Sequence, residues 1–341
     1  MLQLVNQTPF TATMAIFPNV AAVDTLYIVV KATVTLQPRL ALAPKQRPPT
    51  IADEYQGDPA RTSLKAVSDL HIGKPGTDVL VTGHAKAPNG RPTPEMLVSV
   101  AVAERQKTIR VCGDRVWLRD GTPTEPRPFT AMPLTWERAY GGRHAQGERV
   151  LAEERNPVGC GFLGERDPVE LAGQPAPNLL DVRAPGWRLG EAAVPACCAP
   201  TAASWLPRRQ FAGTYDEAWQ RRRAPYLPQD FNPCFLQCAS EELRFDRFLQ
   251  GTEAVRVTGM TLERPIEFAV PTVKPQIEIV IDRYAGRRNS TRAIAELETL
   301  WIEPDENEAS LTWRAHLPVD RRALKVEKVC ITLPQQNGSR S

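Results

Sequence analysis

The chain has 341 residues, of which 42 are basic and 39 acidic, giving a formal net charge of +3. Because charges of both signs are spread along the chain, we expect no single-sign surface that would attract nucleic acid. No stretch approaches the roughly 18 apolar residues that a membrane-spanning helix needs, so no membrane insertion is expected. The 32 prolines in 341 residues are nearly twice the average content of about 5%. This excess favours many turns and few long helices.

The start of the chain, Met1 to Gln7, lacks the basic and apolar segments of a secretory leader, and we therefore expect a cytoplasmic location. The chain has seven cysteines, an odd number. A reducing compartment keeps thiols free, so buried free cysteines are expected rather than a disulfide framework.

Alternating apolar and polar residues predict strands in the first third of the chain. The clearest pattern covers 26–36, where apolar residues occupy the even positions and Lys31, Thr33 and Thr35 fall between them. Such a period of two is typical of a half-buried strand. Further strands are expected at 79–81 and 96–103, and a hairpin is expected to join 108–111 to 115–118 around residues 112–114. This part is predicted to be antiparallel.

The stretch from 122 to about 210 is rich in Pro and Gly and has almost no periodicity, which is typical of loops. It also contains the aromatic residues Phe129, Trp136, Tyr140, Phe162, Trp187 and Trp205. Because disordered segments are poor in aromatic residues, long ordered loops are expected here.

Two short helices and a second group of strands are expected in the last third. Thr214 and Glu217 fit a capping box for a helix over 215–223, and Pro225 would end it. A second helix is expected to begin after Ser240 on the same criteria, with Glu241 in its first turn. Strands are predicted at 255–257, 266–270, 277–281, 297–302, 311–316 and 326–333. The polar residues 335–341 are expected to form a flexible tail.

These patterns predict a mainly β fold in which antiparallel sheets pack as a sandwich, with long ordered Pro/Gly-rich loops and one or two short helices. We expect a single β-rich domain over 1–334, with a division into 1–121 and 122–334 as the alternative.

Two patterns could indicate cofactor or metal binding, and neither has the required context. Residues 159–164 match G-x-G-x-x-G, but no buried strand precedes them and no helix follows, so packed-loop glycines are the better interpretation. Cys197 and Cys198 are adjacent, and Cys234 and Cys238 are four apart, without a nearby histidine. A zinc site remains the minor alternative to buried free thiols, and no cofactor is expected.

Catalytic motifs are also missing from the sequence. The four histidines, His71, His84, His144 and His316, lie in separate segments, and no G-x-S-x-G or H-E-x-x-H pattern occurs. Folding could still assemble a triad from distant segments. We nevertheless predict a protein without enzymatic activity and without catalytic residues.

A series of motifs in a fixed order resembles a known bacterial family. The blocks are 133–142 (PLTWERAYGG), 156–162 (NPVGCGF), 204–209 (SWLPRR), 213–219 (GTYDEAW) and 225–231 (PYLPQDF), preceded by 31–33 and 74–85. This order is similar to the family catalogued as domain of unknown function 2169. The residues that carry the resemblance are Trp136, Glu137, Arg138, Tyr140, Gly141, Gly142, Asn156, Pro157, Gly159, Trp205, Gly213, Thr214, Tyr215, Asp216, Trp219, Asp230 and Phe231.

The resemblance implies an accessory role in type VI secretion, as an adaptor or chaperone that binds a toxic effector and assists its loading onto the spike of VgrG and PAAR proteins. It implies no catalytic residues, and the motif residues are expected to be structural or partner-binding. The alternatives are a structural spike component exported with the tip and, ranked lower, a hydrolase or effector-modifying enzyme. The chain departs from the family pattern at 195–200, where the loop could select a partner or its cysteines could fill the core.

Overall fold

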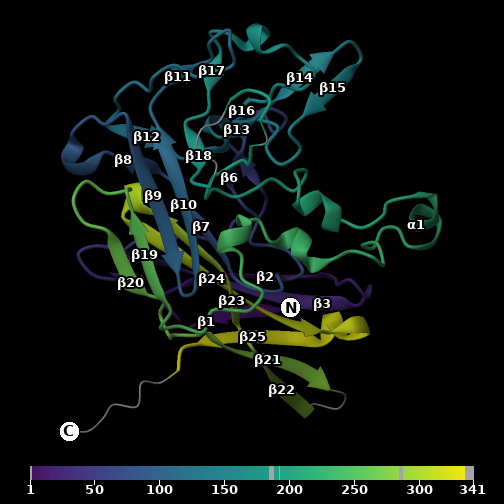
Figure 1. Cartoon of the computed structure of the whole chain (residues 1–341). Helices are drawn as coiled ribbons and strands as arrows, with labels where there is room; N and C mark the ends of the chain where they lie inside the picture. Colours follow the sequence, from purple (N-terminus) through teal and green to yellow (C-terminus); the bar gives the residue numbers. More distant parts are fainter. Residues whose placement is uncertain (1, 184–187, 192, 284–286, 335–341) are drawn as a thin grey trace.

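The computed structural model describes residues 2–183, 188–191, 193–283 and 287–334. The expected tail at 335–341 and Trp187 lie outside the described residues. Three larger sheets form the body of the molecule (Figure 1). The mainly β prediction is confirmed.

The first sheet contains β2 (Thr11–Pro18), β3 (Asp24–Thr35), β24 (Glu308–Pro318), β23 (Glu296–Glu303) and β7 (Asp78–Val81), with β4 (Ala41–Leu42) beside β3. The second contains, in spatial order, β18 (Leu179–Asp181), β10 (Arg105–Cys112), β9 (Glu95–Val102), β19 (Ala254–Thr258) and β20 (Ile266–Ala269). The third contains β1 (Gln3–Asn6), β25 (Val326–Thr332), β21 (Gln276–Arg283) and β22 (Arg287–Ala293). Buried side chains from all three sheets, such as Ile28, Val100 and Val329, belong to one hydrophobic core.

Within the described ranges, five two-stranded ladders lie outside the large sheets. They pair β5 (Glu54–Tyr55) with β6 (Leu64–Ala66), β8 (His84–Lys86) with β12 (Ala131–Pro133), β11 (Arg115–Val116) with β17 (Pro175–Ala176), β13 (Tyr140–Gly141) with β16 (Cys160–Gly161), and β14 (Arg143–Gln146) with β15 (Arg149–Ala152). Single 3₁₀ turns occur at Pro88–Gly90, Trp136–Arg138, Pro168–Leu171, Arg208–Phe211, Pro233–Leu236, Glu241–Leu243, Pro304–Glu306 and Asp320–Lys325.

Strand β3 is buried on both faces, so the prediction of a half-buried strand is wrong. Its even-numbered side chains enter the main core, as the alternation indicates. Its odd-numbered side chains are covered as well, and Lys31 is 8% and Thr33 0% exposed. The polar residues in the pattern therefore lie in a second, polar part of the protein interior and not at the surface.

The pairing of two predicted strands also differs from expectation. Strand β7 runs parallel to β23, so the first third is not purely antiparallel. The hairpin expected around 112–114 does not form, because β10 pairs with β9 and β18 whereas β11 pairs with β17. At Gly113 the chain passes so close to another segment that an added Cβ would lie 1.7 Å from the carbonyl oxygen of Arg127. The chain leaves the sheet there instead of turning back.

The Pro/Gly-rich stretch packs over one end of the five-stranded sheet. A second, smaller cluster of buried residues holds it there: Cys112, Trp117, Leu171, Ala176, Leu180 and Leu189. The expected helix near 215 is α1 (Glu217–Arg222), but its N-cap is Asp216, whose carboxylate accepts from the Trp219 backbone N–H, rather than Thr214. The second expected helix is only the 3₁₀ turn Glu241–Leu243. Leu243 and Phe245 are nonetheless buried, because the segment packs extended against the core.

Candidate protein-interaction site

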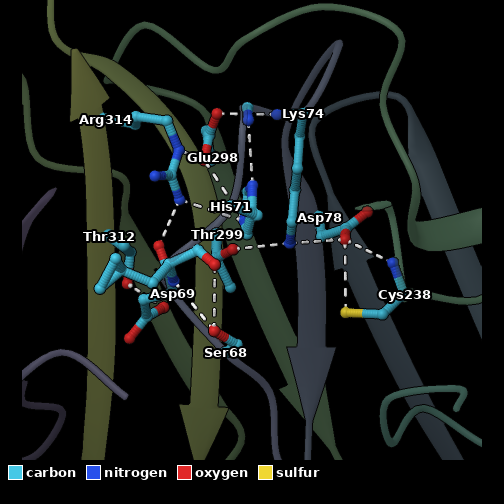
Figure 2. Close-up of polar contacts among 12 residues, drawn as sticks. Ser68, Asp69, His71, Lys74, Asp78, Cys238, Glu298, Thr299, Thr312 and Arg314 are labelled. Carbon is cyan, nitrogen blue, oxygen red and sulfur yellow. Dashed lines mark hydrogen bonds and ion pairs between the residues drawn. The ribbon is translucent and has the colours of Figure 1, made fainter. Parts of the chain in front are cut away.

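The second face of the six-stranded sheet carries a stripe of polar side chains on four neighbouring strands. Lys31 of β3 lies opposite Thr312 of β24, and Thr299 of β23 lies opposite both Thr312 and Asp78 of β7. Side chains directly opposite one another in neighbouring strands share a face. The segment 68–74 covers this stripe and adds further charged groups, as Figure 2 shows.

These buried charges are paired with good geometry. Lys31 Nζ lies 2.8 Å from Asp69 Oδ2, and Arg314 Nε lies 2.6 Å from Glu298 Oε2. Lys74 Nζ lies 2.8 Å from Asp78 Oδ2. The side chains of Lys74, Asp78, Glu298 and Arg314 are at most 4% exposed. Paired and hydrogen-bonded charges can persist in a protein interior, so this network joins the strands to the segment that covers them.

The network also contains His71, although sequence analysis found no companion for any histidine. Its ring nitrogens lie 3.1 Å from the Gly73 backbone nitrogen and 3.1 Å from Arg314 Nη2. Burial, reinforced by the positive charges of Arg314 and Lys74, lowers the pKa of His71 well below its ordinary value of 6.5. The ring is therefore neutral at pH 7. Neither His71 nor its charged neighbours line any of the cavities described below, which makes a structural role the better interpretation.

The other histidine with a close carboxylate is His84, whose Nδ1 lies 2.8 Å from Asp305 Oδ2. This exposed pair is shared with Lys86, whose ammonium lies 2.9 Å from Asp305 Oδ1. Because Lys86 already pairs with this carboxylate, Asp305 would stabilise a protonated His84 ring less than an unshared carboxylate would. The geometry is that of a surface ion cluster.

Of the four cysteines that sequence analysis weighed as metal ligands, Cys197, Cys198 and Cys238 are buried thiols and Cys234 is half-buried. Burial raises the pKa of Cys197, Cys198 and Cys238 to about 12. Within the described part of the chain, no three His, Cys, Asp or Glu side chains are placed to hold a metal ion. All seven cysteines are free.

One group of motif residues forms a packed cluster, here called the knot, around the fully buried Asn156. Asn156 Nδ2 donates to the carbonyl oxygens of Trp136 and Tyr140, both at 2.8 Å. An added Cβ at Gly141 would lie 2.1 Å from the Asn156 carbonyl oxygen, and one at Gly159 would lie 2.4 Å from Asn156 Nδ2. Only glycine fits at these close approaches, which accounts for Gly159 in the G-x-G-x-x-G match, and positive φ angles of +85° and +63° account for Gly161 and Gly164.

Two tryptophans of the motifs pack at right angles next to this knot. The ring centroids of Trp136 and Trp205 are 5.8 Å apart, with an interplanar angle of 89°. Trp136 Nε1 donates to the carbonyl oxygens of Ala199 and Pro200 at 3.1 and 3.0 Å. The loop 195–200 is thus part of the core, and its two cysteines fill space rather than meet a partner.

The two charged motif residues of the knot, Glu137 and Arg138, form hydrogen bonds within the protein. Glu137 accepts from the backbone N–H and the hydroxyl of Ser63 at 2.7 and 3.0 Å. Arg138 Nη1 donates to Asp114 and to Asn178, both at 3.0 Å. The remaining knot residues are Gly142, where an added Cβ would lie 2.8 Å from the Gly159 carbonyl oxygen, and half-buried Pro157.

The second group of motif residues forms a projecting segment, here called the arm, which comprises residues 213–230. Figure 1 shows α1 at its tip, extended away from the sheets. Thr214 donates from its backbone N–H and its hydroxyl to Asp230, at 3.0 and 2.7 Å, and so closes the base. Gly213 has a φ of +81°, which favours glycine at this turn. Next to the base, Phe231 is buried and stacks edge-on against Phe235 at 5.6 Å.

The arm presents aromatic and cationic side chains to solvent. Tyr215 is 54% and Tyr226 39% exposed, and α1 has no buried residue. The rings of Tyr215 and Trp219 meet edge to face at 4.7 Å, and Trp219 Nε1 donates to the Tyr226 carbonyl oxygen at 2.8 Å. This aromatic pair is therefore fixed by contacts within the arm rather than by the core. Sequence analysis named Tyr215 and Trp219 but could not separate them from the buried motif residues.

The fold and the two groups of motif residues define a mainly β protein whose motifs divide between a buried knot and an exposed arm. The chain belongs to the family described as uncharacterized protein conserved in bacteria, DUF2169, whose model matches residues 21–314. No curated protein and no solved structure matches the chain significantly. In the described residues, no helix is long and apolar enough to cross a membrane.

Proposed function

We propose that this protein is an accessory protein of type VI secretion that binds a cognate toxic effector in the cytoplasm and assists its loading onto the VgrG and PAAR spike. The biological setting comes from the ordered motifs of the sequence. The molecular basis is the arm, which supplies a surface suited to protein binding. The proposed role is that of an adaptor or chaperone without catalysis.

The observation that carries the proposal is the group of aromatic side chains on the arm, where Tyr215 and Tyr226 are exposed and Trp219 is half-buried beside Tyr215. Tyr, Trp and Arg are the residue types that contribute most to binding energy at protein interfaces. The Thr214–Asp230 hydrogen bonds and the Asp216 cap order the backbone of the arm in the unbound protein. A surface ordered in advance loses less conformational entropy on binding, so more of the contact energy appears as affinity.

The arm also carries positive charge, and Arg223 links it to the body by donating from Nη2 to the Val20 carbonyl oxygen. Arg221 pairs with Glu217 on the same helix. Arg223 donates from Nε to the Leu227 carbonyl oxygen at 2.8 Å and its guanidinium lies 5.9 Å from the ring centroid of Tyr226. Arginine next to tyrosine offers a partner both charge-assisted hydrogen bonds and stacking.

The proposal is tested by co-expressing the chain with the products of adjacent reading frames and measuring which proteins co-purify. An effector or a spike protein is the expected partner. The double variant Tyr215→Ala, Trp219→Ala is expected to weaken that complex by about 30-fold or more, corresponding to the loss of about 2 kcal/mol at a hot spot. Leu324→Ala is the matched control, because Leu324 is 99% exposed and lies outside the arm.

Two outcomes would contradict the proposal. One is that no neighbouring toxin or spike protein binds and deletion of the gene leaves effector secretion intact. The other is that the protein appears in secreted material together with the spike, which would favour an exported structural component over an adaptor that stays in the cell.

A further inference from the structure

Arg115 lines two cavities at the end of the five-stranded sheet. In that sheet Arg110 of β10 lies opposite Leu97 of β9 and Leu180 of β18, and Glu95 lies opposite Cys112. These side chains share one face, which is turned away from the core residues Ile109 and Val111 because successive residues of a strand alternate. The segment that follows β10 then brings Arg115, from β11, over this face.

The Arg115 guanidinium is only partly satisfied by the protein. Its Nη2 donates to the Pro177 carbonyl oxygen at 2.8 Å. Its Nε is buried and has no hydrogen-bond partner. A buried donor without an acceptor is unfavourable, and a charged donor more so, which makes this atom a binding point for an acceptor from outside.

The smaller cavity has a volume of about 310 Å³ and is rich in guanidinium groups. Arg110, Arg115 and Arg188 line it together with the hydroxyl-bearing Thr122, whereas Glu95 is the one carboxylate in its wall. Two further carboxylates are close to Arg188, since its backbone N–H donates to Glu191 at 3.0 Å and its charge helps to lower the pKa of Asp120 after the hydrogen bonds from Thr122. The lining itself therefore holds three guanidinium groups and one carboxylate.

The larger cavity, of about 810 Å³, shares Arg115 with the smaller one. Val116, Pro175 and Ala176 give it an apolar wall, and Val116 is 38% exposed. The charged motif residues in its lining, Glu137 and Arg138, are already bound to Ser63 and Asp114. A cleft with one apolar wall, next to a hollow lined by guanidinium groups, is complementary to a short segment of polypeptide with an acidic residue.

We propose that the smaller cavity binds one carboxylate group of a partner polypeptide and that the larger cavity receives the residues next to it. This inference rests on the proposed function, because the polypeptide belongs to the partner. Guanidinium groups match the planar carboxylate with paired hydrogen bonds. Of the anions that guanidinium groups bind, the carboxylate is the one that an unmodified partner polypeptide carries on its Asp and Glu side chains.

The test uses the full chain and two capped tripeptides, acetyl-Ala-Glu-Pro-amide and acetyl-Ala-Gln-Pro-amide, with inorganic phosphate as a third probe at constant ionic strength. The Nε–H resonance of Arg115, assigned as the signal lost in Arg115→Lys, reports on the site. We expect the Glu peptide to shift this resonance with a dissociation constant on the order of 1 mM, and the Gln peptide to bind about tenfold more weakly or less. In calorimetry, Arg115→Lys should weaken binding of the Glu peptide about tenfold, because lysine keeps the positive charge but lacks the paired donors of the guanidinium group.

Arg119→Gln is the matched control, because Arg119 is exposed and lines neither cavity. Equal binding of the two peptides, no shift of the Arg115 resonance, tighter binding of phosphate than of the Glu peptide, or an equal loss in Arg119→Gln would each overturn the inference. Melting temperatures of both variants near that of the parent chain show that the fold is intact. Co-purification with a partner through the arm is measured separately, so its failure contradicts the proposed function and not the carboxylate site.

Discussion

Thr214 and Asp230, which are 16 residues apart in the sequence, close the base of the arm with two hydrogen bonds. These bonds, led by that from the Thr214 backbone, hold the pKa of Asp230 below its ordinary value. The carboxylate is therefore charged and accepting at neutral pH. The closure determines whether the arm is a rigid binding surface or a flexible loop.

Asp230→Ala is expected to open the arm without unfolding the body. Amide hydrogen exchange should accelerate over 214–229, and partner binding should weaken, because the arm must then be ordered during binding. The melting temperature should change little, since α1 buries no residue. Asp246→Asn, at another exposed carboxylate, is the control. Unchanged exchange over the arm would show that the Thr214–Asp230 contact does not hold it closed.

Gly141→Ala is expected to disrupt the motif knot. The new methyl group would lie 2.1 Å from the Asn156 carbonyl oxygen, at a φ of +150° that disfavours side chains. We expect a loss of at least about 2 kcal/mol in the free energy of unfolding, measured by urea titration. Gly147→Ala is the matched comparison, because its φ of +60° is also unfavourable but nothing lies within 4 Å. It should cost only about 1 kcal/mol, and equal losses would contradict the steric account.

Arg314→Met should destabilise the protein by about 3 to 5 kcal/mol, because it leaves the Glu298 carboxylate buried without its cation. The double variant Arg314→Met, Glu298→Gln should recover part of that loss. Its amide can still accept from the Lys74 backbone N–H, which lies 2.8 Å from Glu298 Oε1. Denaturant unfolding of the single and double variants measures the difference. A double variant no more stable than Arg314→Met would show that the unpaired charge is not the cause.

Stability is expected to fall as the pH drops below 6.5, in part because of His71. Its pKa is lowered in the folded protein by burial and by Arg314, so the unfolded chain binds the proton first. The stability that depends on neutral His71 is complete above pH 6.5 and is lost below it, by at most about 1.4 kcal/mol per pH unit. The carboxyl groups with lowered pKa, such as Glu153 and Glu242, contribute mainly below their ordinary value of 4.5.

His71→Gln should therefore flatten the dependence of unfolding free energy on pH between 4.5 and 6.5, while leaving the steeper acid limb in place. Urea titrations at several pH values within this window provide the measurement. His144→Gln, at a half-buried histidine in the two-stranded ladder β14–β15, is the control. An unchanged slope in His71→Gln would rule out His71 as the titrating group.

Local sequence patterns determined most of the longer strands, but they missed β2 and β22 and the short strands between 122 and 210. The alternation over 26–36 identified β3, and short apolar runs identified β9, β19, β21, β23, β24 and β25 close to their observed bounds. Patterns of this kind depend on which side chains point the same way along one strand, and that is fixed by the backbone itself. They also fixed the helical character near residue 217, although the cap is Asp216 and not Thr214.

Only the tertiary structure decided what covers each face and which motif residues reach solvent. The sequence pattern predicts that Lys31 is exposed. In the structure it is buried, and its charge is paired with that of Asp69, which is 38 residues away. The parallel pairing of β7 with β23 joins segments separated by more than 200 residues, and no local pattern encodes such a partner. Trp136 and Trp219 look alike in the motifs, but one is 4% exposed in the knot and the other belongs to the arm. Burial is a property of the whole assembled chain, so the separation of core from interaction surface required the fold.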